Sequence, residues 1–259
     1  MNLARTWVVA RNVFREVIRD RILYLIAFYA VLMVAAAVLL PYVAANTQNK
    51  ILVDVGVGAI GILGLLIAIF VGTSLVSKEI EKRTVFVMIA KPVSAAEFIV
   101  GKHWGLTAVI ADLVIAMTAI SFGIFYWQQI PFPALSLGIA ALFQILELSL
   151  MVAVALLFGV ITSPVLAMLL TIAVYLMGHL SRDLLALGEL AQSPVIQTVT
   201  QALYLILPDL ARLTWRNQAV YGTALLPPPL ELLNHAAYGI FYTVLLLAIT
   251  TLIFSRRQF

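Results

Sequence analysis

The sequence predicts an all-α integral membrane protein with six transmembrane helices. We expect an amphipathic interfacial helix before them, a charged cytosolic loop between the second and third, and an external re-entrant hairpin before the last. Hydrophobic residues make up 63% of the 259 residues and charged residues only 11%, whereas a soluble domain carries about 25% charged residues. This much apolar surface does not fit one water-soluble core, so lipid is the expected solvent for a single transmembrane domain, residues 1–259.

Residues 1–21 are predicted to form the interfacial helix. At 100° per residue, one face is apolar and contains Leu3, Trp7, Ala10, Phe14, Val17 and Ile18. The opposite face contains Arg5, Arg11, Arg15 and Arg19. Such a pattern is typical of a helix lying in the membrane interface, and the alternative is a cytosolic helix packed on the chain's own loops. Because the arginines are spread along the segment, no cleavable signal peptide is expected.

Six apolar segments follow, each long enough to cross a bilayer. They are residues 22–43, 55–77, 104–127, 134–162, 164–181 and 232–254. The first would span roughly 33 Å at about 1.5 Å per residue. A QQIPFP turn separates the third from the fourth, and Thr162-Ser163-Pro164 separates the fourth from the fifth.

The distribution of Lys and Arg predicts the orientation. With both termini in the cytosol, twelve of the sixteen lie on the cytosolic side, as the positive-inside rule requires. A prokaryotic plasma (inner) membrane is the expected location. The longest connection, residues 182–231, is then external. Its YLILPDL run, residues 204–210, is too short to span and contains a proline, which favours a re-entrant or interfacial hairpin.

Two carboxylates lie inside predicted spans, Asp112 in the third and Glu147 in the fourth. A charged Asp at the bilayer centre costs about 2.5 to 3.5 kcal/mol on insertion scales, so each must face protein or water, or stay protonated. One interpretation is a polar lining of a substrate path. The other is a structural hydrogen bond between helices. In the second span Gly64, Ala68 and Gly72 recur every four residues, a spacing that favours close helix packing.

No catalytic or metal-binding motif is present in the sequence. It has no G-x-x-x-x-G-K-S/T run, no HExxH pair, no G-x-S-x-G elbow and no cysteine. Its three histidines, His103, His179 and His235, are scattered. We expect no enzymatic activity, no bound metal or cofactor, and no nucleic-acid partner.

The loop of residues 77–103 combines charge with apolar residues. It contains eight of the chain's Asp, Glu, Lys and Arg residues and the apolar run TVFVMIA. Lys91-Pro92 breaks a helix, and Ser94 with Glu97 forms a capping box that begins another. Two short helices with a rigid corner suit docking on a protein. The alternative is a solvated hairpin lying on the lipid headgroups.

In the order of these motifs the chain resembles the membrane subunit of ATP-binding-cassette transporters of the type-two exporter permease class. Members carry an acidic pair after the second span, a Thr, a Pro-Val-Ser, and a Gly-Lys at the start of the third span. The matching residues are Glu79, Glu81, Thr84, Pro92, Val93, Ser94, Gly101 and Lys102. The six spans and the external hairpin also match. Arg83 stands where a Gly is frequent, and Ala95 where an Arg is frequent.

The resemblance implies that residues 77–103 are a coupling-helix region docking on a separate ATPase, which would hold ATP and magnesium. It also implies a dimer: two ATPase subunits and a second copy of this or a similar permease, surrounded by lipid. The second and fifth spans would line the path between the copies. That makes Thr73, Tyr175 and His179 candidate lining residues beside Asp112 and Glu147.

Two other classes stay open. One is a secondary, proton-coupled transporter with Asp112 and Glu147 as relay carboxylates. The other is a non-transporting membrane subunit that helps to assemble a complex. The identity of a transported substrate does not follow from the sequence.

Overall fold

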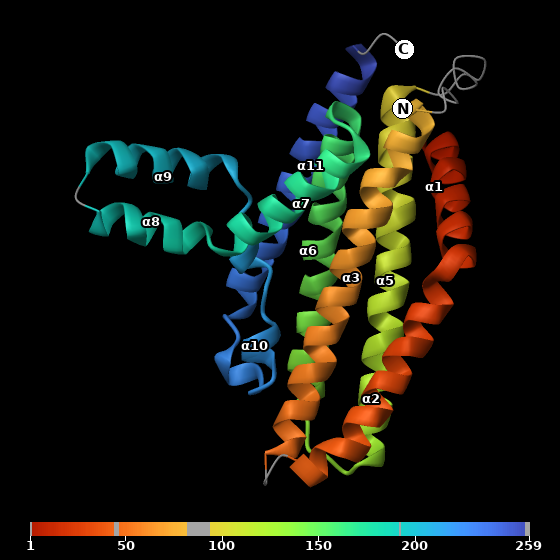
Figure 1. The fold of residues 1–259 in the computed structure, drawn as a ribbon, viewed down its shortest axis with the longest axis vertical. Helices are drawn as coiled ribbons and strands as arrows, with labels where there is room; N and C mark the ends of the chain where they lie inside the picture. Colours follow the sequence, from red (N-terminus) through yellow and green to blue (C-terminus); the bar gives the residue numbers. More distant parts are fainter. Residues whose placement is uncertain (1, 44–46, 82–93, 192, 257–259) are drawn as a thin grey trace.

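A computed structural model describes residues 2–43, 47–81, 94–191 and 193–256. Every regular element in these ranges is helical, and none is a strand. Five helices are long and apolar enough to cross a membrane, or six if a bent pair counts as one span. The all-helical membrane fold predicted from the sequence is therefore confirmed (Figure 1).

The N-terminal part of the chain forms one long interrupted helix: α1 (Leu3–Val17), a π-helical turn (Ile18–Ile22) and α2 (Leu23–Val43). It runs parallel to α5 (Ala95–Trp127) over its whole length. At one end the Asn2 amide donates to Glu97 Oε1 at 2.6 Å. Further along, the Tyr29 hydroxyl bonds Ser121, and Gln128 donates to the Ala37 carbonyl.

The face on which α1 packs in the protein is turned from the predicted apolar face, with which it shares Ala10 and Val17. Its buried residues are Thr6, Ala10, Val13 and Val17. Leu3 and Trp7 of the predicted apolar face remain more than 60% exposed. The reason lies in α5, where Gly101 and Gly105 have no side chain and let the small residues of α1 approach closely.

The centre of the bundle is α6 (Ala134–Ile161), which packs against α3 (Gln48–Glu81), α5 and α11 (Pro229–Arg256). In the most apolar 18-residue stretch of α6, 61% of the residues are buried, whereas the share in the peripheral α2 is 17%. Gly64 lies against Leu148, and Gly72 against Ala155. The predicted small-residue stripe of the second span is thus where α3 meets α6.

The fifth predicted span, residues 164–181, corresponds to α7 (Pro164–His179) and ends at a bend. The helix α7 reaches the length of a span only together with α8 (Ser181–Leu190), from which a bend of 62° separates it. Next comes α9 (Pro194–Ile206), which packs antiparallel on α8. The α8–α9 hairpin extends sideways from the bundle (Figure 1). The turns η2 (Leu210–Arg212), α10 (Arg216–Ala219) and η3 (Thr223–Leu225) then lead to α11.

Candidate functional site

A cluster of polar side chains lies where α6, α7 and the segment around α10 meet. We call Glu147, His179, Thr214 and Arg216 the Glu147 centre. His179 Nε2 lies 3.3 Å from Glu147 Oε1, and Arg216 Nη2 lies 3.4 Å from the same oxygen. The Thr214 hydroxyl donates to Glu147 Oε2 at 3.1 Å. Glu147 is only 1% exposed, so its carboxylate is held by protein groups rather than by water.

Each member of the Glu147 centre is fixed by its own helix or turn. His179 ends α7, and its Nδ1 lies 3.0 Å from the Tyr175 carbonyl one turn earlier. Nδ1 therefore faces the Tyr175 carbonyl, and Nε2 faces Glu147 and Thr214, so the ring connects α7 to the buried carboxylate. Burial by itself lowers the pKa of Arg216, but Glu147 and Tyr175 outweigh it and raise that pKa. One guanidinium therefore balances one carboxylate in this buried place.

A cavity of about 390 Å³ opens beside the Glu147 centre. It lies between α3, α7 and the segment of residues 214–221, and its polar lining includes Asp54, Tyr175, His179, Arg216, Asn217 and Tyr221. Glu147 is not part of the wall, so it stands behind His179 and Arg216. The volume falls within the range of small-molecule sites, about 300 to 1,000 Å³.

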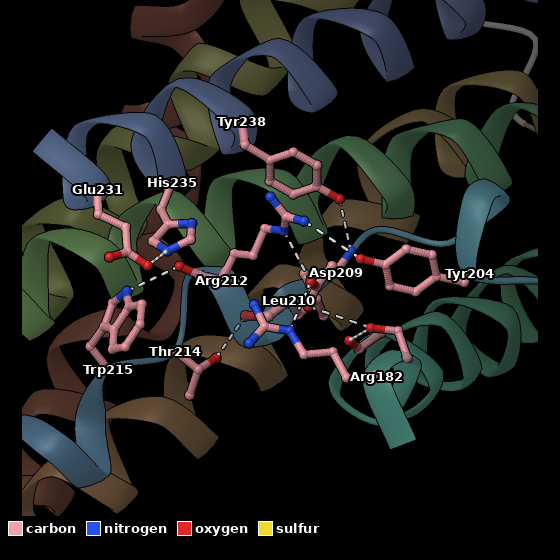
Figure 2. A network of polar contacts seen from close by, with 12 residues as sticks. Arg182, Tyr204, Asp209, Leu210, Arg212, Thr214, Trp215, Glu231, His235 and Tyr238 are labelled. Carbon is pink, nitrogen blue, oxygen red and sulfur yellow. Dashed lines mark hydrogen bonds and ion pairs between the residues drawn. The ribbon is translucent and has the colours of Figure 1, made fainter. Parts of the chain in front are cut away.

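A second cluster holds the bend between α7 and α8. We call Arg182, Asp209, Arg212 and Tyr238 the Asp209 hub. Arg182 Nε and Arg212 Nε each lie 3.0 Å from Asp209 Oδ2, and Figure 2 shows both guanidinium groups turned toward this carboxylate. The Asp209 amide donates to the Tyr238 hydroxyl at 2.8 Å, which ties the hub to α11. Hydrogen bonds to Tyr204 and Asp209 raise the pKa of Arg212.

The two clusters are joined. The Thr214 hydroxyl that contacts Glu147 also lies 3.1 Å from the Leu210 carbonyl, one residue beyond Asp209. Gly178 of α7 lets residues 208–210 approach closely, because a Cβ at position 178 would lie 2.8 Å from the Pro208 carbonyl oxygen. The Leu-Pro-Asp-Leu stretch of the predicted hairpin is therefore packed directly against the end of α7.

Of the five predicted path residues, the structure brings three together: Glu147, Tyr175 and His179. Thr73 is elsewhere, buried between α3 and α6, with its hydroxyl on the Ile69 carbonyl at 2.7 Å. Asp112 is exposed on α5 and makes no hydrogen bond or ion pair with the residues that the structure describes. Since Gly105 lies against Ala10, and Ser121 bonds Tyr29, Asp112 is level with the π-helical turn of residues 18–22.

The predicted coupling residues that the structure describes belong to the end of α3 and the start of α5. Glu79 and Glu81 belong to the last turns of α3, but their side chains, like Thr84 and Pro92 altogether, lie outside the described residues. Ser94 caps α5 in the predicted capping box with Glu97. Gly101 and Lys102 are buried.

Gly101 and Lys102 make packing contacts within the chain. Gly101 lies against Val9 of α1. The Lys102 ammonium lies 5.3 Å from the centre of the Phe98 ring, which stacks on Phe254 of α11. Gly101 thus lets α1 approach the start of α5, and Phe98 connects α5 to α11.

Thr214, Arg216 and the Asp209 hub did not follow from the sequence. The sequence did contain a signal for them. Of the four Lys and Arg residues predicted to be external, three are Arg182, Arg212 and Arg216. A carboxylate inside a span needs a cation or a donor, but the sequence does not show which of these arginines reaches it. Over the described ranges, no three His, Asp or Glu side chains are close enough to hold a metal ion.

Comparison with known proteins identifies the family of this chain. Residues 7–259 match the family model described as ABC-2 family transporter protein. A search of curated proteins gives no significant match. The family match covers nearly the whole chain, including every helix of the bundle and both polar clusters. This chain belongs to the ABC-2 family of transporter proteins, as a membrane-spanning permease subunit.

Proposed function

We propose that this permease is the membrane subunit of an ATP-driven exporter. It would form the substrate path with a second copy and dock on two separate ATPase subunits through residues 77–103. The observation that carries the proposal is the ABC-2 family match over residues 7–259, since this family implies association with an ABC ATPase. The chain itself has no phosphate-binding loop, so ATP and magnesium would be bound by the partner.

The arrangement of α3, α5 and α1 supports the proposed docking region. The α3 and α5 helices flank residues 82–93. The start of α5 is tied to α1 by the bond from the Asn2 amide to Glu97. A force applied to residues 77–103 would therefore reach α3 directly and α1 through α5, which fits coupling by movement of rigid elements.

The cavity beside the Glu147 centre is the part of this chain that we assign to the substrate path. Tyr175 and His179 line it, while Glu147 braces the wall from behind. Glu147 is matched by Arg216, so it needs no proton to be stable in its buried place. This favours a structural role for Glu147 and an energy source other than a proton gradient.

The docking assignment is tested with Glu79→Ala and Glu81→Arg. The permease is reconstituted with its ATPase, and substrate-stimulated ATP turnover and ATPase retention are measured. We expect both variants to insert normally and to lower coupled turnover. Glu16→Ala, on the exposed face of α1, serves as the matched control. Wild-type turnover and retention in both variants would contradict the docking role.

The proton-coupled alternative is tested with Glu147→Gln and Asp112→Asn. An amide keeps hydrogen bonding but cannot exchange a proton, so a relay would stop, whereas an ATP-driven permease would retain most of its transport. Glu147→Leu should weaken the bundle, because it removes interhelical bonds worth about 0.6 to 2 kcal/mol each. Transport is measured at constant ATP with and without an uncoupler. Inactive amide variants, together with an uncoupler-sensitive wild type, would favour the secondary carrier.

A further inference from the structure

We propose that Arg182 and Arg212 bind the phosphate group of an anionic phospholipid at the base of the α8–α9 hairpin. The proposal concerns a surface that the cavity and the Glu147 centre do not include. It does not depend on ATP coupling or on the direction of transport.

The first observation is an excess of positive charge at a fixed place. Both Nε atoms lie 3.0 Å from one oxygen, Asp209 Oδ2, so the two guanidinium groups are side by side. The second Asp209 oxygen lies 3.4 Å from the Ser181 hydroxyl, which adds no charge. One carboxylate cannot neutralise two guanidinium groups, so the four residues of the hub carry one net positive charge. The neighbouring Asp183 is exposed on α8 and makes no ion pair with either arginine in the described part of the chain.

The second observation is the direction in which the charge faces. The Asp209 side chain is only 4% exposed, whereas those of Arg182 and Arg212 are 53% and 37% exposed. Each arginine uses Nε for Asp209. No acceptor for the terminal nitrogens of Arg182 is found in the part of the chain that the structure describes. The planar fork of a guanidinium fits two phosphate oxygens.

The third observation is that the site is largely formed in advance. Arg212 lies over the Tyr238 ring at 5.0 Å, and its Nη2 approaches the Tyr204 hydroxyl at 3.5 Å. Figure 2 shows Arg212 between these two rings. Side chains that are already ordered lose less conformational freedom on binding. A phosphate should therefore bind here more readily than at an arginine that moves freely on the surface.

The surroundings favour a lipid over a free phosphate. Exposed apolar residues adjoin the arginines and Tyr204 in the chain: Leu180 is 51% exposed, Leu205 79% and Ile206 72%. These residues would contact acyl chains while the headgroup phosphate meets the guanidinium groups. Tyrosines such as Tyr204 and Tyr238 are also typical of the depth at which headgroups lie.

The test uses the purified full-length permease in a neutral detergent. Phosphatidylglycerol, phosphatidylcholine or inorganic phosphate is added in increasing amounts. Bound lipid is measured by native mass spectrometry and the unfolding temperature Tm by a thermal scan. We expect phosphatidylglycerol to be retained and to raise Tm, and Arg182→Gln to weaken its apparent affinity by about tenfold, the effect of one charge-assisted hydrogen bond. Lys50→Gln, which removes an exposed cation near the start of α3, away from both the hub and the basic face of α1, should behave as wild type.

Equal effects of phosphatidylglycerol and phosphatidylcholine, or unchanged binding in Arg182→Gln, would overturn the proposal. Saturation by inorganic phosphate at the same concentration would overturn the assignment to a lipid. Arg182→Lys guards against a folding defect in the glutamine variant. It keeps the charge but loses the fork, so it should bind phosphatidylglycerol more weakly than wild type, and wild-type affinity in this variant would contradict recognition by the guanidinium.

Discussion

In the described part of this permease two helices are interrupted, and the two interruptions are stabilised in different ways. Between α1 and α2 the chain makes one π-helical turn, Ile18–Ile22, and continues along the same neighbour, α5. Between α7 and α8 it bends by 62° at Leu180 and leaves the bundle. The first interruption lies beside a continuous helix, whereas the second is surrounded by the Asp209 hub and adjoins the Glu147 centre.

The difference follows from what each break does to packing. A π-helical turn keeps the backbone hydrogen bonds within the helix, and the packing of Val13, Val17 and Tyr29 continues across it. A sharp bend leaves backbone groups without helical partners and removes the following helix from its neighbours. Here Ser181 donates to the Gly178 carbonyl, and Asp209 pairs with Arg182 and Arg212 next to the bend. We infer that apolar packing stabilises the first break and polar contacts the second.

The largest effect is expected from Asp209→Ala. This change leaves Arg182 and Arg212 without their shared carboxylate, whereas Ser181 keeps the Gly178 carbonyl. We expect a loss of about 2 to 4 kcal/mol in the free energy of unfolding, less than for a fully buried pair because both arginines reach solvent. A thermal scan in detergent measures it as a lower Tm.

The control for Asp209→Ala is Asp183→Ala, which removes an exposed carboxylate from the first turn of α8. It should change Tm only slightly. If both variants unfolded at the same temperature, the hub would not be what holds the bend.

An intermediate effect is expected from Gly105→Ala at the first interrupted helix. The added Cβ would lie 2.6 Å from the Ala10 carbonyl oxygen and 2.7 Å from Val13 Cβ, so α1 must move away from α5. Overpacking of this kind costs about 1 to 3 kcal/mol. Gly123→Ala on the same helix has open space around its Cβ and is the matched control. A Tm unchanged by Gly105→Ala would show that α1 is not held by close packing.

The smallest effect is expected from Glu97→Gln at the start of α5. Glu97 accepts hydrogen bonds from the Asn2 and Ser94 amides, and a glutamine side chain keeps only one oxygen to accept them. We expect faster hydrogen exchange at the first amides of α1 with little change in Tm. Glu16→Gln, exposed on α1, should leave that exchange unchanged. Wild-type exchange in Glu97→Gln would show that the contact does not order α1.

The sequence predicted the helices better than their packed faces. Runs of apolar residues and the Pro164 restart were enough to locate α6 and the beginning of α7. Only part of the buried face of α1, Ala10 and Val17, lay on the predicted apolar face, because the packing depends on two glycines of α5 that lie far away in the chain. The predicted fifth span, residues 164–181, ends within two residues of the end of α7, but the sequence did not reveal that the chain bends there into the further helix α8.

The same division holds for the candidate site. By itself the sequence established that Glu147 lies in an apolar helix and must face protein or water, or stay protonated, because an isolated charge is costly there. Only the tertiary structure decided that the partners are His179, Thr214 and Arg216, and that Asp112 does not join them. Local sequence patterns determine where helices form. Which charged side chains come into contact depends instead on the path of the chain between the helices. Here that path is set by the bend at Leu180 and the packing of Leu210 on Gly178.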